Sequence, residues 1–253
     1  MQEFSPSDNL ARTGAADLFD HYSFYDIPVH CPYGLPKVAV YHQNRFATVD
    51  DESMAAFFDR GFRRNGNIMY SMACPDCRAC IPIRLKPGEF RPNRNQKRVW
   101  KRNRDVSVEM VPLRITGEKL SLLEKFLRLR YSSRENSALG YYSDFFINSL
   151  THTREILYRI QNRLIGVALV DMGKNFLNGV YFYFDPDDHK RSPGTFNILY
   201  LLDFCQRHHV EHFYLGFLIK EIQAMSYKQN FRPHYLRINN IWQRFDRGEK
   251  KPV

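Results

Sequence analysis

The sequence predicts an α+β protein in two parts, with a change of character near residue 110. In the second half the expected elements run helix, helix, three strands, helix, strand, an order typical of an α+β sheet. A hairpin signal at 172–175 lies between two of these strands and favours antiparallel pairing. Four of the five cysteines and most of the excess positive charge lie in the first half. We therefore expect a smaller cysteine-bearing, basic α/β module at 1–110 and a second domain at 111–253.

The composition is that of a folded protein with no membrane span. Apolar residues make up 43% of the 253 residues and aromatic residues 15%, which is ample for a packed core. No apolar run approaches the roughly 18 residues that a span requires. The first residues lack the basic-then-apolar layout of a secretory signal. An odd number of cysteines argues against a disulfide scaffold, so the cytoplasm is the expected compartment.

In the first half, the sequence predicts an arm over 1–27 and a turn-rich stretch over 28–36. An alternating apolar run predicts a strand within 37–49. A helix is predicted over 50–61. Acidic side chains lie at its N-terminus, which is the positive end of the helix dipole, and Gly61 can cap its C-terminus. A strand at 81–85, a basic helix over 93–104 and a strand at 106–111 follow.

In the second half, apolar spacing predicts an amphipathic helix over 119–131 and a short helix over 143–150. Strands are expected at 155–160, 164–172 and 177–184. A helix over 195–208 and a strand at 212–219 complete the pattern. We expect these strands to form a mostly antiparallel sheet.

The cysteine segment has the spacing of a metal site. Cys74, Cys77 and Cys80 are each three residues apart, and the turn between such residues can direct sulfurs at one ion. With Cys31 as a fourth ligand the set would suit zinc or an iron–sulfur cluster. The alternative is a tight turn with small buried thiols. Arg78 would favour a thiolate and hence a redox-sensitive role.

A basic block follows the cysteines. Residues 78–104 hold ten Lys or Arg and one acid, so this block alone carries +9 of the net +10. Such a localised charge is typical of a polyanion partner, although a solvated basic surface is the alternative. Trp100 could stack on a base, but anchoring the helix to the protein is the favoured interpretation. The expected phosphate contacts are Arg91, Arg94, Lys97, Arg98, Lys101 and Arg102.

A series of short motifs resembles one family over about residues 31–237. They are Cys31-Pro32-Tyr33, Gly61-Phe62-Arg63-Arg64, the run from Cys74 to Arg84, the run from Phe90 to Arg98, Tyr183-Phe184-Asp185-Pro186, the run from Gly194 to Leu199, Tyr214-Leu215-Gly216-Phe217, Met225-Ser226-Tyr227-Lys228 and Phe231-Arg232-Pro233. In this order they resemble the arginyl-tRNA–protein transferase superfamily, and its bacterial aspartate/glutamate leucyltransferase branch in particular.

This resemblance implies a C-terminal half similar to the GCN5-related acetyltransferase fold. It implies transfer of leucine from leucyl-tRNA to the N-terminal α-amine of proteins that begin with Asp or Glu, which marks them for degradation. The partners are then aminoacyl-tRNA and those acceptor proteins, and no cofactor is required. One alternative is transfer of arginine. An alternative of another class is a non-catalytic, metal-dependent nucleic-acid-binding regulator.

Three positions depart from the family pattern. Ala224 stands where a lysine is usual, Leu218 where an aromatic residue is usual, and Pro193 where a leucine is usual. The missing lysine bears on the choice of acceptor more than on the class of reaction.

The expected chemistry selects six further residues. The ester on tRNA is already activated, so no phosphate-binding loop is needed, and none is found. Asp185, Tyr227 and Lys228 are the catalytic candidates, although Asp185 could simply form a turn. An acidic acceptor favours a guanidinium, so Arg78 and Arg84, with Tyr33, are the acceptor-binding candidates. A structural salt bridge is the alternative for each arginine.

Overall fold

The computed structural model describes residues 22–130 and 137–248. The predicted arm therefore lies mostly outside the described residues, but its end was predicted wrongly. Residues 25–27 belong to the first strand, β1 (Tyr25–His30), because their backbone groups pair with a neighbouring strand. No helix in the described part of the chain is long and apolar enough to cross a membrane.

The core of the molecule is an eight-stranded sheet in the order β12-β11-β5-β10-β9-β8-β7-β6. All neighbours are antiparallel except β9 and β10, which confirms the α+β class with a mostly antiparallel sheet. The strands are β5 (Ile81–Leu85), β6 (Val106–Pro112), β7 (Thr153–Ile160), β8 (Arg163–Met172), β9 (Phe176–Phe184), β10 (His212–Leu218), β11 (His234–Ile238) and β12 (Ile241–Phe245).

A second, four-stranded sheet carries the N-terminal part in the order β1-β2-β4-β3. Its other strands are β2 (Val38–Arg45), β3 (Arg63–Asn65) and β4 (Ile68–Met72). Helix α2 (Asp51–Asp59) begins where the Asp50 side chain accepts a hydrogen bond from the Ser53 N–H. It buries Met54, Phe57 and Phe58 in an aromatic core that also contains Tyr214 of β10.

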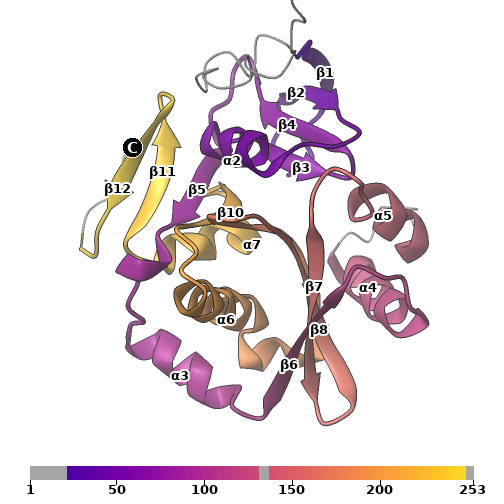
Figure 1. The fold of residues 1–253 in the computed structure, drawn as a ribbon, viewed down its shortest axis with the longest axis vertical. Helices are drawn as coiled ribbons and strands as arrows, with labels where there is room; N and C mark the ends of the chain where they lie inside the picture. The colour runs from indigo at the N-terminus through magenta and orange to yellow at the C-terminus, as the bar shows by residue number, and fades with distance from the viewer. Residues whose placement is uncertain (1–21, 131–136, 249–253) are drawn as a thin grey trace, which may run out of the picture.

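Helices cover both faces of the large sheet. On one face lies α6 (Pro193–Arg207), with α3 (Arg94–Arg102) packed outside it. On the other face lie α4 (Gly117–Arg130) and α5 (Ala138–Phe145), as Figure 1 shows. Strand alternation explains this, because Ala168 and Val170 of β8 join the α6 core while Val167 and Leu169 join the α4–α5 core.

Several predicted elements were misplaced or missed. The helix predicted at 143–150 is wrong. The helix is α5, five residues earlier, because the Ser137 side chain accepts a hydrogen bond from the Gly140 N–H and so caps its start. Five short strands were not predicted: β1, β3, β4, β11 and β12. Each is six residues or fewer, too short for a clear alternating pattern.

Strand β5 lies deep in the large sheet, between β10 and β11. Its residues come from the first half of the chain, whereas both neighbours come from the second half. The large sheet thus draws strands from both sides of residue 110. The division into 1–110 and 111–253, with a separate cysteine-bearing module, stays a prediction.

Candidate functional site

The two parallel strands β9 and β10 separate within the sheet. They pair over only three positions, Phe176–Asn178 with His212–Tyr214. Just beyond these, the register of β9 against β8 shifts between Gly179 and Tyr181, and that of β10 against β5 shifts between Tyr214 and Gly216. Bulges turn strands away from their neighbours, so the sheet opens into a split at this point.

A cavity of about 1000 Å³ occupies the split and reaches both faces of the sheet. Its walls come from β9, β10, α4, α5, the start of α6, the N-terminal sheet and the segment 222–228. The charged residues among its described walls are Arg63, Arg64 and Lys228, and no Asp or Glu is among them. The site is therefore positive and free of carboxylates within the described part of the chain.

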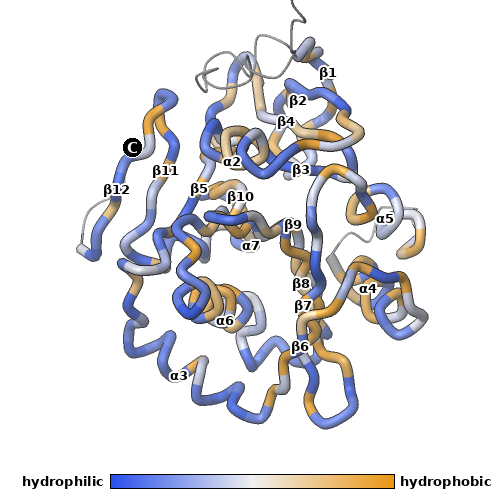
Figure 2. The backbone as a smooth tube through the Cα atoms, viewed as in Figure 1, coloured by the Kyte–Doolittle hydropathy of each residue, from blue (hydrophilic) through white to orange (hydrophobic). Residues whose placement is uncertain are grey.

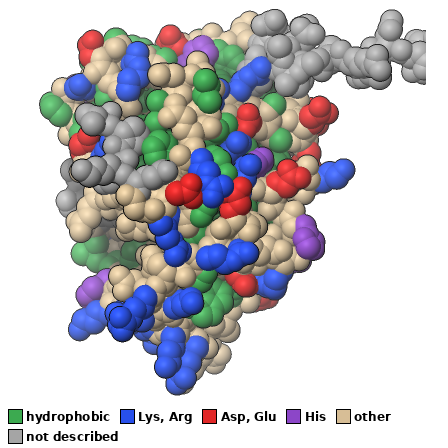
Figure 3. Space-filling view, turned by 90° about the vertical axis from the view of Figure 1, so that its left-hand side faces the viewer, with side chains coloured by type: hydrophobic (Ala, Val, Ile, Leu, Met, Phe, Trp, Pro, Cys, Tyr) green, Lys and Arg blue, Asp and Glu red, His purple; other side chains and the backbone are tan. Residues whose placement is uncertain are grey.

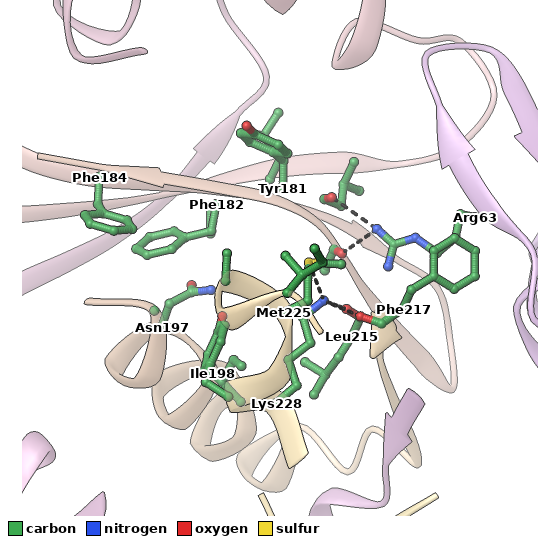
Figure 4. Close-up of a pocket in the computed structure, with 18 of the residues that line it drawn as sticks. Arg63, Tyr181, Phe182, Phe184, Asn197, Ile198, Leu215, Phe217, Met225 and Lys228 are labelled. Atoms are coloured by element: carbon green, nitrogen blue, oxygen red, sulfur yellow. Dashed lines mark hydrogen bonds between the residues drawn. The ribbon is translucent and has the colours of Figure 1, made fainter. Parts of the chain in front are cut away.

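Two cations hold the edges of the split apart. Nη2 of Arg63 donates to the carbonyl oxygens of Gly179 and Val180 on β9, at 3.3 and 3.2 Å. Nζ of Lys228 donates to the carbonyl oxygens of Leu215 and Phe217 on β10, at 2.8 and 2.9 Å, as Figure 4 shows. Where β9 and β10 separate, these carbonyl oxygens no longer receive hydrogen bonds from the neighbouring strand. The two side chains supply the missing donors. The two side chains therefore stabilise the open form of the sheet.

One end of the cavity is aromatic. Phe126 of α4 and Phe184 of β9 lie there with their ring centroids 5.2 Å apart. Tyr141, Phe145 and Phe146, at α5, complete this end. Such a surface favours an apolar side chain over a charged one.

The other end is cationic and lined by tyrosines. Burial raises the pKa of Tyr33 well above its usual value and Tyr70 raises it further, whereas the Arg63 charge lowers it. Burial also raises the pKa of Tyr70, against the lowering effect of Arg63. Both hydroxyls therefore stay protonated at neutral pH, and both lie within electrostatic reach of the guanidinium.

The first turn of α6 opens into the cavity. Ser192 precedes the helix in the left-handed conformation (φ 56°), and Pro193 and Gly194 form its first positions. A Cβ on Gly194 would lie 3.2 Å from the Tyr227 hydroxyl, so the helix start and Tyr227 are in close contact. The free N–H groups of this turn give the cavity a positively polarised wall.

The three residues predicted to be catalytic are not brought together. Tyr227 and Lys228 line the cavity, but Asp185 is not among its walls. Asp185 accepts hydrogen bonds from Lys125 at 2.6 Å and Arg163 at 3.1 Å. Burial alone would raise the pKa of Asp185, but the Lys125 contact and the Asp187 N–H outweigh it and lower that pKa. The structure therefore places Asp185 in an ion-pair network beside the site.

The residues predicted to bind the acceptor are likewise dispersed. Tyr33 lines the cavity. Arg78 is exposed and donates to the carbonyl oxygens of Cys74 and Cys77, which closes the cysteine turn. Arg84 is buried outside the cavity, where it contacts Asp59 and stacks over the Trp242 ring at 4.3 Å.

The cysteine segment adjoins the cationic end of the cavity. Burial raises the pKa of Cys80 to about 12, and Cys74, Cys31 and Cys77 raise it further, so the four thiols are near neighbours. The Val40 N–H donates to Sγ of Cys74 at 3.4 Å, which links the segment to β2. Among residues 22–130 and 137–248, no three His, Cys, Asp or Glu side chains are arranged to hold a metal ion. Zinc or an iron–sulfur cluster at these cysteines stays a prediction.

The predicted basic helix is confirmed as α3, and its charges face outward. A capping box between Asn93 and Gln96 starts the helix, and Gln96 is buried. Trp100 contacts Phe196 of α6, with ring centroids 5.8 Å apart, which supports the anchoring interpretation. Figure 2 shows the helix as hydrophilic along most of its length, and Figure 3 shows Lys and Arg gathered at this end of the molecule. The exposed cations at this end are Arg91, Arg94, Lys97, Arg98, Lys101, Arg102 and Arg104.

Arg63 is the residue of the site that sequence reasoning missed. It lies in the motif Gly61-Phe62-Arg63-Arg64, where the sequence alone does not distinguish two adjacent arginines. Successive side chains of a strand point to opposite sides. On β3 this directs Arg63 to the split and buries Arg64 against Asp171.

Comparison with known proteins gives consistent matches. The family model described as "Arginine-tRNA-protein transferase, N terminus" matches residues 29–98, and its C-terminal counterpart matches residues 118–238. Among the matching relatives are bacterial proteins named aspartate/glutamate leucyltransferase. The one from Saccharophagus degradans is 37% identical over 78% of this chain and 85% of its own length. The relative from Methylobacillus flagellatus is 35% identical over 77% of this chain and 79% of its own length. The relative from Hahella chejuensis is 30% identical over 87% of this chain and 95% of its own length.

Solved structures resemble the chain more distantly. The C-terminal domain of a putative lysylphosphatidylglycerol synthetase from Agrobacterium fabrum has a TM-score of 0.46 at 15% identity, covering 70% of this chain and 55% of that one. FemX has a TM-score of 0.43 at 9% identity, covering 76% and 79%.

The sequence matches therefore define this α+β protein as a transferase that uses aminoacyl-tRNA and a protein as substrates. More particularly, the chain belongs to the arginine-tRNA-protein transferase family, whose two models together cover most of its length.

Proposed function

We propose that this protein transfers leucine from leucyl-tRNA to the N-terminal α-amine of proteins that begin with Asp or Glu. The relatives at 30–37% identity are named for this reaction. The observation on this chain that carries the proposal is the cavity in the split of the sheet, which is aromatic at one end, cationic at the other and free of carboxylates on its described walls.

The cavity favours leucine over arginine as the donated residue. A bound arginine would bring a guanidinium into a partly desolvated site, where burial of a charge without a counter-charge is costly. The described walls offer it no Asp or Glu, and their own charges are positive. A leucyl side chain at the aromatic end, between α4 and α5, would be packed without such a cost.

The same charge distribution favours an acidic acceptor. Arg63 and Lys228 would attract a carboxylate and repel an N-terminal Lys or Arg side chain. The Lys228 ammonium is already engaged by carbonyl oxygens of β10, so Arg63 is the cation with the greater capacity for a ligand.

We further propose that the large sheet is of the GCN5-related acetyltransferase type. Support comes from a single parallel pair that separates after a bulge, with the start of a long helix facing the opening. In the reaction, the neutral α-amine attacks the ester carbonyl, a C–N bond forms, and the C–O bond to the ribose breaks. One amine proton passes to the leaving ribose oxygen. The free N–H groups at the start of α6 are suited to stabilise the developing oxyanion.

No cofactor is needed for this step, because the ester is already activated. The α-amine has an ordinary pKa of about 7.7–8.0, so a substantial fraction is neutral at cell pH. Positioning amine and ester together can then supply much of the rate. Since the donor is made by the translation apparatus, we place the protein in the cytoplasm.

The basic end of the molecule is our proposed tRNA contact. Exposed Lys and Arg on and beside α3 would bind backbone phosphates without reading base identity. Nearer the cavity, we keep Tyr227, Lys228 and Asp185 as candidates with separate roles. Tyr227 and Lys228 would shape the cavity, while Asp185 would act through Lys125 and Arg163.

A substitution series tests this division of roles. Tyr227→Phe and Lys228→Met should lower kcat with leucyl-tRNA affinity retained. Asp185→Asn should lower thermal stability and leave the pH dependence of kcat unchanged. A kcat whose pH profile shifts in Asp185→Asn would instead make Asp185 the proton acceptor.

The deciding experiment measures transfer of labelled amino acid from charged tRNA to a peptide that begins with Asp. Leucyl-tRNA and arginyl-tRNA are compared at equal concentration. We expect transfer from leucyl-tRNA to dominate. Dominant transfer from arginyl-tRNA would support the arginyl alternative. No transfer from either, with tRNA still bound, would support the non-catalytic regulator.

A further inference from the structure

The Arg63 side chain lies inside the split of the large sheet, although its backbone belongs to the small one. Its Nη2 bridges the carbonyl oxygens of Gly179 and Val180, so the guanidinium is fixed against β9. On the opposite side it approaches the Phe217 ring of β10, at 5.9 Å from the ring centroid. Figure 4 shows this guanidinium directed at the middle of the cavity.

The chain leaves space for this guanidinium at one position of β10. Gly216 adopts φ +81° at the bulge, and a Cβ built there would coincide with Nη1 of Arg63. Any other residue at 216 would both strain the backbone and displace the guanidinium. Gly216 and Arg63 are therefore fitted to each other.

The Tyr70 hydroxyl interacts with this guanidinium, but two of its nitrogen atoms have no hydrogen-bond acceptor within the described residues. Its Nε and Nη1 atoms are buried and unpartnered. The neighbouring arginine differs sharply, because Arg64 is hydrogen-bonded to Asp171, Gly66 and Thr153. Buried donors of a charged group are costly to leave unpaired, so Arg63 is suited to bind an anionic ligand.

The position of Arg63 defines the kind of anion. Its free donors lie in the split between two strands, beside the hydroxyl-bearing rings of Tyr33 and Tyr70. A carboxylate at the end of a short side chain can enter such a place. The phosphates of a nucleic-acid backbone are matched instead by the exposed cations of α3, at the surface.

We propose that Arg63 binds the side-chain carboxylate of the acceptor's first residue and so sets the preference for Asp and Glu over Asn and Gln. This inference rests on the function proposed above. In it, Arg63 takes the role that the sequence suggested for Arg78 and Arg84, with Tyr33 beside it. The carboxylate accepts a charge-assisted hydrogen bond from Nη1 or Nε.

The test uses peptides that differ only at the first residue: Asp, Asn, Glu and Gln. In Arg63→Gln, kcat/KM for the Asp peptide should fall by about 10- to 150-fold, which corresponds to about 1.5–3 kcal/mol. Transfer to the Asn peptide should fall by a smaller factor, because its amide offers the guanidinium no charge to bind. The Asp/Asn ratio would then approach one. An equal loss for both peptides would overturn the proposal and assign Arg63 only to holding the split.

Two glycine substitutions provide an independent steric test. Gly216→Ala should displace the guanidinium and lower the Asp/Asn ratio without removing any charge. Gly248→Ala is the matched control, since Gly248 has a similar φ of +87° but no atom within 4 Å of its Cβ position. A ratio that stays at the wild-type value in Gly216→Ala, with the fold intact by circular dichroism, would contradict the fitted pair.

A binding measurement separates this proposal from the proposed function. Calorimetric titration of Asp and Asn peptides into the full chain, without tRNA, requires no leucyl transfer. Tighter binding of Asp than Asn that is lost in Arg63→Gln supports Arg63 even if the donated amino acid is not leucine. A preference that survives Arg63→Gln but disappears in Arg84→Gln or Arg78→Gln would overturn the assignment.

Discussion

Arg64 and Asp171 form a two-bond ion pair that is wholly enclosed by the protein. Nε and Nη2 of Arg64 each lie 2.9 Å from an oxygen of Asp171, and both side chains have 0% exposure. The pair connects β3 of the small sheet to β8 of the large one. Thr153 and Asn178 also donate to this carboxylate, so hydrogen bonds from three side chains replace the water that Asp171 loses on burial.

Removal of one partner should therefore be costly. We expect Asp171→Ala to lower the free energy of unfolding by about 3–5 kcal/mol, because it leaves a buried guanidinium uncompensated. Urea titration followed by circular dichroism measures this. The control is Asp203→Ala, which breaks the exposed pair with Arg207 on α6 and should cost about 0.5 kcal/mol or less. Equal effects of the two changes would contradict the structural role of the pair.

Substitution of three α3 cations should weaken tRNA binding and reduce its salt dependence. If Lys97, Arg98 and Lys101 each contact a phosphate, changing them together to Ala should reduce the slope of log K against log salt by about 2–3. Filter binding from 50 to 300 mM salt measures the slope, and saturating tRNA should largely restore turnover.

A triple variant elsewhere on the surface controls for net charge. Arg154, Lys174 and Arg207 are exposed and lie outside α3, so their change to Ala removes the same charge. This variant should keep a slope close to that of the wild type. The same slope in the α3 variant and the wild type would rule out α3 as the contact.

The cysteines should support the cationic end of the cavity. Cys77→Ser and Cys80→Ser should each raise KM for the acceptor peptide more than they lower kcat, because the segment adjoins Tyr33. Elemental analysis and absorption spectra of protein purified without oxygen test whether metal or a cluster accompanies the thiols. Full activity and stability of both variants would reduce the segment to a simple turn. Cys205→Ser serves as the control, since that thiol lies in the core away from the segment.

His234 should make the protein less stable as the pH falls. Burial, with help from Arg232, lowers the pKa of this imidazole from 6.5 to about 4. The unfolded chain therefore takes up a proton below pH 6.5 that the folded protein does not bind above pH 4. Proton uptake by the unfolded chain alone favours unfolding. The free energy of unfolding is therefore highest above pH 6.5 and falls by roughly 3 kcal/mol between pH 6.5 and 4, at 1.36 kcal/mol per pKa unit.

Stability curves at several pH values check this expectation. His234→Gln should flatten the decline in the free energy of unfolding between pH 6.5 and 4. His208→Gln, at an exposed position at the end of α6, should leave the decline unchanged. An unaltered decline in His234→Gln would assign the acid sensitivity to other groups.

The longer elements were predictable because their signals are local. The helix α6 and the strands β7 to β9 follow from apolar spacing over eight or more residues, and α3 from its charge pattern. The helix α5 was misplaced because a cap at Ser137 outweighed the apolar pattern that follows. The short strands β3 and β12 each pair with a strand next to them in sequence, but at three and five residues they are too short for a clear alternating pattern. Strand β11 also pairs with β5, about 150 residues earlier, which local periodicity does not reveal.

The site was predicted only in part for a related reason. Tyr33, Tyr227 and Lys228 were identified through the family motifs, and all three line the cavity. Asp185 was chosen for its place at a strand end, yet its partners Lys125 and Arg163 are distant in sequence. The role of Arg63 depends on the register of β3 and on the missing side chain at Gly216, and both are properties of the fold.

The central place of β5 in the large sheet has a consequence for the order of folding. Residues 81–85 leave the ribosome early, but their partners in β10 and β11 follow about 130 and 150 residues later. Contacts so distant along the chain slow folding, since a long loop must close before they form. We therefore expect the protein to fold slowly. We also expect nascent or C-terminally shortened chains to expose both edges of β5, so that they aggregate or bind chaperones.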